Sequence, residues 1–456
     1  MIIDALVAEI GSTTTIINAF DNLSGDSPIF LGSGFADTSV EKGDVTIGLN
    51  QAKEMLMSKM RVNHLVAKES FATSSAAGGL KMSVHGLVYD MTVKAAKEAA
   101  LGAGANLKMI TSGILDEFQI EELKSQTINI IMISGGVDYG EKETALTNAS
   151  TIASLKLNIP VVYAGNVQNQ QIVKKIFKDN EQSDYLYLSD NVYPKIDVLQ
   201  VEKTRKIIQT VFENHIVKAP GMENIKNIIK NSITPTPGAV MEAAKLLYNA
   251  IGDLIIVDIG GATTDIHSVT NGSEAINKIL IAPEPLAKRT VEGDLGVYIN
   301  KDNLIESIGM DRLMNELNIS EFNLKDLIKN YTPIPDEKQI SLTERLSLEA
   351  FNVALKRHSG RLVYFYNSSG KVAYAEGKDL TNVKYIIATG GALTRLPNRL
   401  NIIKNGLSQQ SNLILSPDKK SKILIDKYYI MASLGVLSKA HPEAALMLMK
   451  RSLDID

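Results

Sequence analysis

The chain has 456 residues, enough for roughly two to four domains with a large buried core. Hydrophobic residues make up 45% and charged residues 22%, and the formal net charge of −3 excludes the strongly basic surface of a bulk nucleic-acid binder. There is no cysteine, which excludes disulfides, thiolate zinc sites, iron–sulfur clusters and cysteine nucleophiles.

The composition also sets expectations about location. No apolar run reaches the ~18 residues that a membrane-spanning helix needs, so we expect no membrane partner. Asp4 and Glu9 interrupt the first apolar run, which argues against a signal peptide. The lack of cysteine is compatible with a reducing compartment, and we expect a cytoplasmic protein with no nucleic-acid partner.

The first predicted element is a β-hairpin within Leu6–Ile17, which reads L-V-A-E-I-G-S-T-T-T-I-I. An apolar run, a short polar turn and a second apolar run are typical of a hairpin. Gly11 allows close approach of the backbone to a ligand, and Ser12, Thr13 and Thr14 add hydroxyl donors. A carboxylate at the end of the strand, here Glu9, is suited to hold Mg2+ or orient water. The alternative is an edge hairpin with a Gly-Thr turn and no ligand.

The next two stretches allow two interpretations each. Small residues dominate within Phe71–Leu87, which indicates either a tight packing turn or a cavity lined by N–H and hydroxyl donors. Downstream, three buried strands near 128–133, 161–164 and 185–188 alternate with helices near 142–157, 168–177 and 201–215, which predicts an inserted parallel βαβαβ unit. The strands end in glycines and polar residues that either bind a second ligand or partner, or form plain turns: Gly135, Gly136, Asp138, Gly165 and Asn166.

A second hairpin is predicted at Leu254–Ser268, after a helix that begins near Pro237. Its turn matches the first one: an acid, Ile, Gly, two further residues and two threonines occur in the same order. The aligned residues are Asp258, Ile259, Gly260, Gly261, Ala262, Thr263 and Thr264 against the segment that begins at Glu9. Two copies of this pattern far apart predict two related half-domains that face one ligand, and the parts suit the polyphosphate end of a nucleotide.

The C-terminal part adds a third glycine motif. A glycine- and acid-containing turn is predicted at Thr290–Gly296, helices between about 303 and 357, and strands between 361 and 375. Tyr385–Pro397 reads as a strand that ends in Gly390 and Gly391, followed by a helix. These glycines permit close approach of a ring or ribose, and Arg395 is suited to stack on a base; the alternative is an ordinary βα turn. A helix with a close-packing Gly435 follows within 428–438.

In order, these elements resemble the actin, sugar-kinase and heat-shock-chaperone ATPase superfamily. Its phosphate 1, connect 1, phosphate 2, adenosine and connect 2 motifs match Glu9–Thr15, Thr234–Leu247, Asp258–Asp265, Ile387–Pro397 and Tyr429–Ser438. The resemblance implies an α/β fold with two ribonuclease-H-like lobes, ATP and Mg2+ in the cleft between them, and an inserted Rossmann-like α/β subdomain.

Three further motifs resemble one branch, the GlmL or glutamate mutase MutL family. They are the S-S-A-A-G-G-L core of Phe71–Leu87, the S-G-G-x-D turn of Ser134–Gly140, and R-T-V-E-G-D-L-G at Arg289–Gly296. The family is thought to act as ATP-dependent chaperones or reactivases for adenosylcobalamin-dependent mutases. The resemblance therefore implies a mutase partner, such as glutamate mutase or an aminomutase.

The resemblance also implies roles for individual residues. Phosphate contacts are expected from Gly11, Ser12, Thr13 and Thr14 in one lobe and from Gly260, Gly261, Thr263 and Thr264 in the other. Asp258 is expected to coordinate Mg2+ or its waters, with Glu9 as the second acid. Gly390 and Gly391 are expected at the adenosine, with Arg395 near the base.

Two departures from the superfamily pattern bear on catalysis. Glu9 stands where Asp is usual, so a metal would shift or be held through water. Thr234 stands where heat-shock chaperones carry a Glu that positions the attacking water, and a hydroxyl accepts no proton near neutral pH. Glu242, two helical turns further on, is a weak substitute. We therefore expect a weak ATPase that acts as a conformational switch.

The predicted domain boundaries follow from these motifs. The first lobe begins with residues 1–115, the α/β subdomain covers 116–221, and the connect-1 segment 222–253 returns to the first lobe. The second lobe covers 254–440 and a tail covers 441–456.

Two other functions remain open at this point. The first is a sugar or acid kinase of the same superfamily, and the second is a partner protein that binds nucleotide without hydrolysis. The activators of hydroxyacyl-CoA dehydratases share the hairpins but bridge an iron–sulfur cluster with cysteines, which this chain lacks.

Overall fold

The computed structural model describes residues 1–75, 79–217, 219–367 and 370–455. Ala76, Ala77 and Gly78, in the small-residue stretch singled out above, lie outside the described residues. The chain divides into two compact units, which are Met1–Ala243 with Ala432–Leu448, and Ala244–Met431 with Met449–Asp456.

The first sheet of unit 1 contains the predicted N-terminal hairpin. Its strands are β1 (Ile2–Ile10), β2 (Thr14–Asp21), β3 (Ile29–Asp37), β4 (Val66–Ser74) and β10 (Ile233–Pro235), in the order β10-β4-β1-β2-β3. The pairs β1–β2 and β2–β3 are antiparallel, and β4 is parallel to both β1 and β10. Helix α1 (Val45–Met60) begins at Asp44, whose carboxylate accepts from Thr46 N, and packs against β3, where Gly34 leaves room for its backbone.

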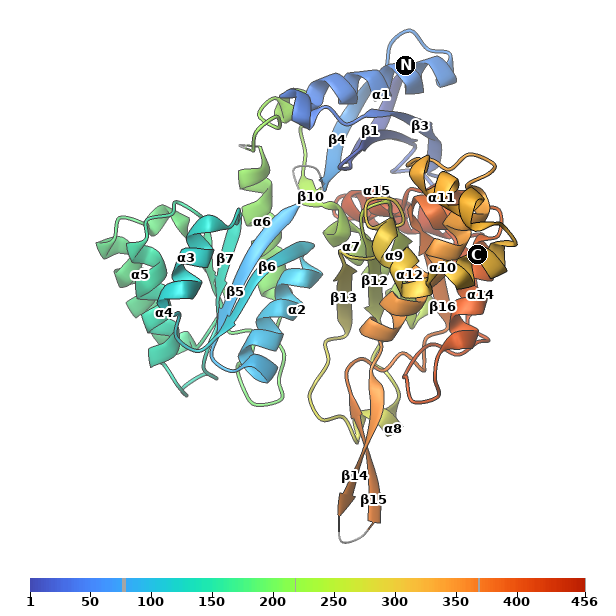
Figure 1. The fold of residues 1–456 in the computed structure, drawn as a ribbon. Helices are drawn as coiled ribbons and strands as arrows, with labels where there is room; N and C mark the ends of the chain where they lie inside the picture. Colours follow the sequence, from blue (N-terminus) through green and yellow to red (C-terminus); the bar gives the residue numbers. More distant parts are fainter. Residues whose placement is uncertain (76–78, 218, 368–369, 456) are drawn as a thin grey trace. The chain divides into compact units, whose positions relative to one another are not determined.

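The inserted subdomain is a second sheet of unit 1. It comprises β5 (Leu80–Gly86), β6 (Ala105–Ser112), β7 (Ile130–Ile133), β8 (Val161–Tyr163) and β9 (Leu186–Leu188), all parallel, in the order β6-β5-β7-β8-β9. Figure 1 shows α2 (Lys94–Gly102) and α6 (Glu202–Ile216) on one face and α3 (Glu117–Ser125), α4 (Glu143–Ser154) and α5 (Gln170–Asp179) on the other.

This sheet extends further toward the N-terminus than the sequence indicated. The three predicted strands are β7, β8 and β9, but β5 and β6 pair with them and lie before the predicted boundary at residue 116. We therefore place the beginning of the subdomain near residue 80. The sheet is buried on both faces, because Ile130 and Met132 of β7 join one hydrophobic cluster while Ile131 and Ile133 join another.

The main sheet of unit 2 has the topology of the first sheet of unit 1. Its strands are β11 (Leu254–Ile259), β12 (Thr264–Val269), β13 (Ala287–Glu292), β16 (Tyr385–Thr389) and β17 (Lys422–Ile425), in the order β13-β12-β11-β16-β17. Numbered along the chain, both sheets read 3-2-1-4-5, with the first three strands antiparallel and the last two parallel to the first. β13 occupies the beginning of the segment predicted as a glycine-acid turn.

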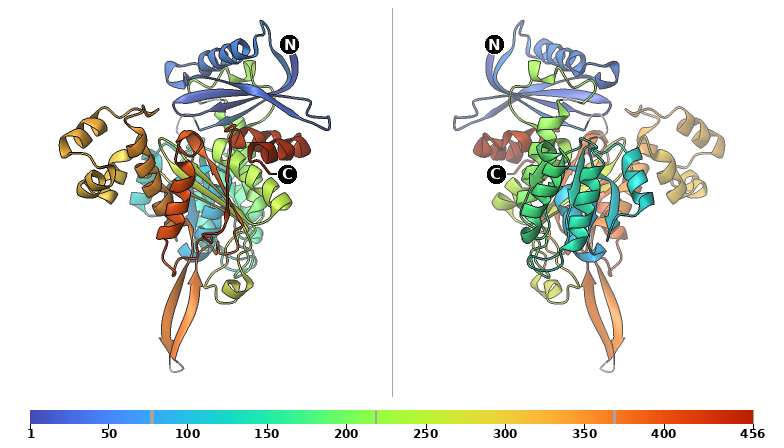
Figure 2. Two further views of the ribbon diagram at one scale, coloured as in Figure 1. Left: turned by 90° about the vertical axis from the view of Figure 1, so that its right-hand side faces the viewer. Right: turned by 90° about the vertical axis from the view of Figure 1, so that its left-hand side faces the viewer.

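Helices complete unit 2, and one ribbon extends from it. The predicted helical region forms α9 (Lys301–Ile308), α10 (Met310–Leu317), α11 (Glu321–Lys329) and α12 (Ile340–His358), and α13 (Gly390–Arg395) and α14 (Arg399–Gln409) follow β16. Strands β14 (Arg361–Asn367) and β15 (Gly370–Glu376) form the projecting two-stranded ribbon in Figures 1 and 2.

Three helices link the C-terminal region to the rest of the chain. α7 (Thr236–Ile251) begins in unit 1 and ends in unit 2, α15 (Met431–Leu437) lies mainly in unit 1, and α16 (Pro442–Ser452) forms the tail. Gly435 is required where α15 meets α7, because a Cβ there would overlap the carbonyl oxygen of Ala239. No helix in the described part of the chain is long and apolar enough to cross a membrane.

Candidate functional site

The first predicted phosphate turn lies between β1 and β2. Gly11 N donates to Thr14 O at 3.0 Å, which closes the turn. Thr38, which follows β3, holds the turn from behind: its Oγ1 donates to Gly11 O at 2.8 Å and its N to Thr13 O at 2.9 Å. Ser12 and Thr13 are exposed, and no described residue accepts a hydrogen bond from their backbone N–H groups.

The second predicted phosphate turn, between β11 and β12, has the same closure. Gly260 N donates to Thr263 O at 2.9 Å. The segment after β13 holds this turn from behind, because Val297 N donates to Gly260 O at 3.2 Å and Tyr298 N to Gly261 O at 2.9 Å. The two turns, which were aligned by sequence, therefore have the same closing hydrogen bond. In each turn, the backbone N–H of the first glycine donates to the carbonyl oxygen of the residue three positions later.

The motif at Arg289–Gly296 supports the second turn directly. A Cβ on Gly296 would overlap the backbone of Ala262, so the close approach of the two segments requires glycine. Asn300 Nδ2 then donates to Ala262 O at 2.8 Å. The sequence resemblance identified this motif without a role, and the structure assigns it the support of the phosphate turn.

The two turns therefore share one electrostatic property. Their carbonyl oxygens are occupied by neighbouring segments, while the N–H groups of Ser12, Thr13, Gly261 and Ala262 donate to no described residue. Successive unpaired backbone N–H groups form a concave partial positive charge that suits an anion. Each turn is thus a preformed candidate for phosphate binding.

The two threonines of the second turn differ in accessibility. Thr263 Oγ1 donates to Asp265 Oδ2 at 2.9 Å, and Thr263 is half-buried. Thr264 is fully buried and its Oγ1 donates to Leu295 O at 2.8 Å. We therefore propose that Thr264 shapes the turn, whereas the sequence indicated that its hydroxyl contacts phosphate.

Asp258 lies at the end of β11, opposite Asp265 of β12 in the strand register. Burial raises the pKa of Asp258 to about 7, and the negative charges of Asp265 and Asp426 add to that shift, while Arg289 opposes it. A carboxylate that is costly to ionise without a cation is suited to take a metal ion in place of its proton.

The pKa of Asp258 leads to a prediction about stability. Between about pH 4 and 7 the unfolded chain has lost the proton that the native carboxyl keeps, so stability falls as pH rises through this window. The Asp258→Asn protein has no carboxyl at this position, so we expect its stability not to fall in this way. The difference in free energy of unfolding between Asp258→Asn and wild type should therefore increase by about 2–3 kcal/mol, in favour of the variant, from pH 5 to pH 8.

Urea denaturation of both proteins at the two pH values measures this difference. Asp311→Asn, at an exposed carboxylate on α10, is the control and is expected to show no such growth. A constant difference between Asp258→Asn and wild type would contradict the prediction.

Asp265 is held by an ion pair that the sequence did not predict. Arg289 Nε and Nη2 donate to Asp265 Oδ1 at 3.0 and 2.6 Å, and both side chains are buried. Arg289 and His267 are direct neighbours in the β12–β13 register. The Arg289–Asp265 ion pair and the hydrogen bond from the Thr263 hydroxyl to Asp265 therefore hold the end of the second turn that leads into β12.

Glu9 also has a partner that was not predicted. The side chain is 8% exposed, and its Oε1 accepts from Ser433 Oγ at 2.5 Å, Ser433 N at 3.1 Å and Asn18 Nδ2 at 3.4 Å. Ser433 lies in the first turn of α15. The carboxylate therefore ties β1 to α15, and a metal role for Glu9 stays a prediction.

Thr234 occupies the predicted connect-1 position, two strands away from Glu9. Glu9, Thr73 and Thr234 form one row across β1, β4 and β10 in the strand register. Thr234 is buried, and Lys439 Nζ donates to its Oγ1 at 3.1 Å. Lys439, just beyond α15, was not identified from the sequence, and burial lowers the pKa of its side chain.

The adenosine motif lies beside Asp258. In the parallel pairing of β11 with β16, Asp258 is opposite Thr389, the residue before Gly390. Gly390 is buried with φ +84°, and a Cβ there would overlap Asp258 Oδ1 and lie 2.6 Å from Ile259 O. A Cβ on Gly391 would meet no atom within 4 Å, and Arg395 is exposed. Of the three predicted adenosine residues, Gly391 and Arg395 are therefore accessible to a ligand, whereas Gly390 is buried.

The structure therefore brings the predicted residues together within each unit. Unit 1 contains the first turn and Glu9, and unit 2 contains the second turn, Asp258 and the adenosine motif. The described residues contain no group of three or more His, Cys, Asp or Glu side chains placed to bind a metal.

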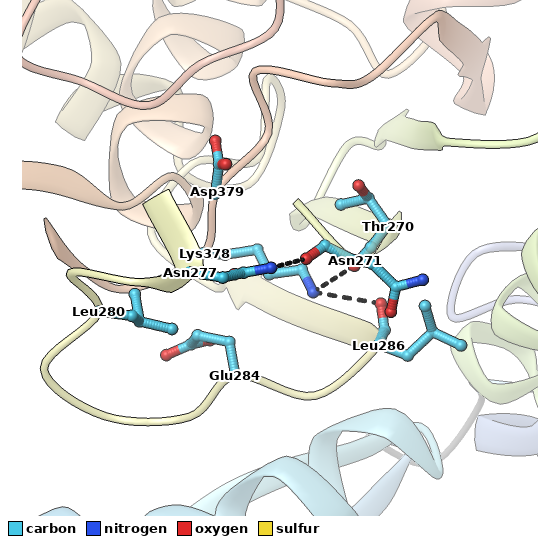
Figure 3. Close-up of a pocket in the computed structure, with 8 residues that line it drawn as sticks. All are labelled: Thr270, Asn271, Asn277, Leu280, Glu284, Leu286, Lys378 and Asp379. Carbon is cyan, nitrogen blue, oxygen red and sulfur yellow. Dashed lines mark hydrogen bonds between the residues drawn. The ribbon is translucent and has the colours of Figure 1, made fainter. Parts of the chain in front are cut away.

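A separate polar pocket lies in unit 2 (Figure 3). Lys378 is buried there, and its ammonium donates to Thr270 O at 2.7 Å, to Leu286 O at 3.2 Å and to Pro285 O. The lining residues are Thr270, Asn271, Asn277, Leu280, Glu284, Leu286, Lys378 and Asp379. None of these is a predicted nucleotide residue, and the Lys378 contacts indicate a structural role.

Two sheets of 3-2-1-4-5 order, each with a glycine-threonine turn after its first strand, define the actin-like ATPase fold with two ribonuclease-H-like lobes. The MutL protein family model matches residues 5–453, and the chain belongs to this family. It is 35% identical over 461 residues to Protein MutL of Clostridium tetanomorphum, with 98% of each chain covered. The family expected from the sequence motifs is thereby confirmed.

Solved structures of other proteins are more distant. A nucleotide-free acetone carboxylase structure is 13% identical with a TM-score of 0.42, and covers 96% of this chain and 70% of its own. A glycerol dehydratase reactivase is 11% identical with a TM-score of 0.38, and covers 96% of this chain and 100% of its own.

Proposed function

We propose that the protein binds ATP through the two phosphate turns, hydrolyses it slowly, and uses this cycle as a reactivase-like chaperone of an adenosylcobalamin-dependent mutase. The observation that supports nucleotide binding is the shared geometry of the turns, in which the N–H groups of Ser12, Thr13, Gly261 and Ala262 donate to no described residue. The mutase partner rests on membership of the MutL family.

Mg2+ fits the chemistry of Asp258. The buried carboxyl has a pKa raised to about 7, and a bound dication would favour its charged form. Bound Mg2+ would neutralise phosphate charge. Gly11, Ser12, Thr13 and Thr14 in one unit, and Gly260, Gly261 and Thr263 in the other, are proposed to hold phosphate oxygens. Gly391 and Arg395 are proposed to contact the adenosine.

Slow turnover is expected from the row of residues that begins at Glu9 and ends at Thr234. The row Glu9, Thr73 and Thr234 places a hydroxyl at the connect-1 position, and Lys439 donates to it. A hydroxyl that accepts from an ammonium does not abstract a proton from water. Catalysis then depends on positioning and electrostatic stabilisation alone.

The expected result with purified protein is Mg2+-dependent ATP binding and turnover below the ~1–1000 per second of ordinary enzymes. We expect Asp258→Ala to weaken Mg·ATP binding at least tenfold, while the Asp311→Ala control binds as wild type. Calorimetry with ATP and Mg2+, and phosphate release, measure both. Turnover within the ordinary range without a partner would refute the switch, and stimulation by one sugar or acid would indicate a kinase.

A further inference from the structure

Large apolar side chains are exposed along one edge of the parallel sheet of the subdomain. Because β5 to β9 are all parallel, the loops that follow them lie along the same edge, the lower end of this sheet in Figure 1. Those loops and the first turn of α3 expose Phe118 at 88%, Tyr139 at 76% and Ile196 at 67%. The full set, here called the apolar edge, is Val88, Tyr89, Ile114, Phe118, Tyr139, Val167, Ile196 and Val198.

The loops that carry the apolar edge are bonded to one another. Asp138 Oδ1 accepts from Asn191 Nδ2 at 3.0 Å and from Val167 N at 3.0 Å. Asn166 Oδ1 accepts from Tyr139 N at 3.3 Å. The S-G-G-x-D motif therefore joins the loops after β7, β8 and β9, so the exposed side chains project from a pre-organised backbone, which lowers the entropic cost of binding.

The same bonds argue against a small ligand at this edge. Ligands of such sheets usually bind where β5 adjoins β7, the point at which the strand order reverses. Here that point is filled, because a Cβ on Gly86 would lie 2.7 Å from Val93 Cγ2 and 3.0 Å from Ser134 Oγ. Asn191 Nδ2 also donates to Gly136 O at 3.0 Å. The polar groups are thus bonded internally, and the apolar groups remain exposed.

Charge indicates the kind of partner. The five loops, residues 87–93, 113–118, 134–142, 164–169 and 189–201, contain seven acidic residues and two lysines, a formal net of −5, whereas the whole chain carries −3. The acids are Asp90, Asp116, Glu117, Asp138, Glu141, Asp190 and Asp197, and the lysines are Lys142 and Lys195. Two copies of this edge would repel each other, so a partner with a basic border is favoured over a second copy.

The exposed area suits a protein interface. The three aromatic side chains of the edge expose roughly 400 Å² between them, and a standard interface buries about 800 Å² on each partner. The aliphatic members add the remainder. We propose that the apolar edge docks a protein whose complementary surface is an apolar patch bordered by lysine and arginine. Resting on the proposed function, this protein is the mutase.

The test uses the full chain and the subunits of an adenosylcobalamin-dependent mutase from the same organism. The edge variant Phe118→Ser/Tyr139→Ser/Ile196→Ser is compared with Phe322→Ser/Ile334→Ser/Tyr366→Ser, whose parent side chains are 80%, 70% and 80% exposed in unit 2. Biolayer interferometry should show at least a 30-fold loss of mutase affinity for the edge variant and less than threefold for the control. Wild-type affinity should also fall as salt rises.

The outcomes separate the two proposals. If wild type binds mutase and the edge variant binds equally well, the docking surface is refuted and the proposed function stands. If wild type binds no mutase, the proposed function fails, and the docking proposal fails with it. Conversion of a wild-type dimer to monomer by the edge variant would refute the heterologous partner. Should the edge variant misfold, Asp116→Lys/Glu117→Lys applies the same test, with a slowed association rate as the expected result.

Discussion

Replacement of Arg289 by methionine is expected to lower the free energy of unfolding of unit 2 by about 3–5 kcal/mol. The guanidinium donates twice to Asp265 Oδ1, and the two side chains are only 3% and 10% exposed. Without it, the Asp265 carboxylate is buried beside Asp258 with no compensating cation. The second turn, which Asp265 anchors through Thr263, should loosen as well.

The double variant Asp265→Asn/Arg289→Met is the matched control, because it removes both charges. It should recover much of the lost stability, since the cost arises from an uncompensated buried charge more than from the missing pair. Chemical denaturation followed by far-ultraviolet circular dichroism measures both proteins. The prediction is contradicted if the single variant loses less than about 1 kcal/mol of its free energy of unfolding, or if the double variant recovers none of it. Either result would show that the Asp265 carboxylate is stabilised by something other than Arg289.

Replacement of Gly390 by alanine is expected to cost about 3 kcal/mol or more. The backbone there has φ +84°, and an added Cβ would overlap Asp258 Oδ1 and approach Ile259 O at 2.6 Å. The obstacle at Ile259 is rigid because it is backbone of β11, whereas the Asp258 carboxylate would have to move. The substitution should therefore displace Asp258 and weaken Mg·ATP binding as well as stability.

Its neighbour provides the control. A Cβ on Gly391 meets no atom within 4 Å, and the residue lies in α13, where alanine is favoured over glycine by about 1 kcal/mol. Gly391→Ala should therefore leave thermal stability unchanged or slightly raised. Equal destabilisation by the two substitutions would contradict the close packing of Gly390 against β11.

Those elements of the fold that have a clear local signal could be predicted from the sequence. Both hairpins, the βαβαβ order of the subdomain, the helices after residue 300 and the strand that leads to Gly390 have local periodicity or turn chemistry. Six strands were missed, namely β4, β5, β6, β10, β13 and β17. The end of β4 and all of β5 lie in a stretch that was interpreted by its small residues, and the other four strands pair at the outer edges of sheets and lack a distinctive pattern.

The sequence predicted the glycines and acids of the candidate site. It did not predict the side chains that form hydrogen bonds to the acids and threonines. Glu9 is bonded to Ser433, which is 424 residues away in the chain. Thr234 is bonded to Lys439, 205 residues away. No periodicity connects such positions, so sequence reasoning alone could not pair them. Arg289 belonged to a motif that indicated the family, yet its partner Asp265 appears only once β12 and β13 lie side by side.

The sequence by itself determined the two matched turns, because an acid, a glycine and threonines at the end of an apolar run specify backbone geometry within a few residues. It also determined the family. The tertiary structure decided which groups remain free to bind: it covered the Thr264 hydroxyl and the Gly390 backbone, left the N–H groups of Gly261 and Ala262 unpaired, and exposed the apolar edge of the subdomain. Turn chemistry depends on neighbours in the chain, whereas burial and hydrogen-bond satisfaction depend on neighbours in space.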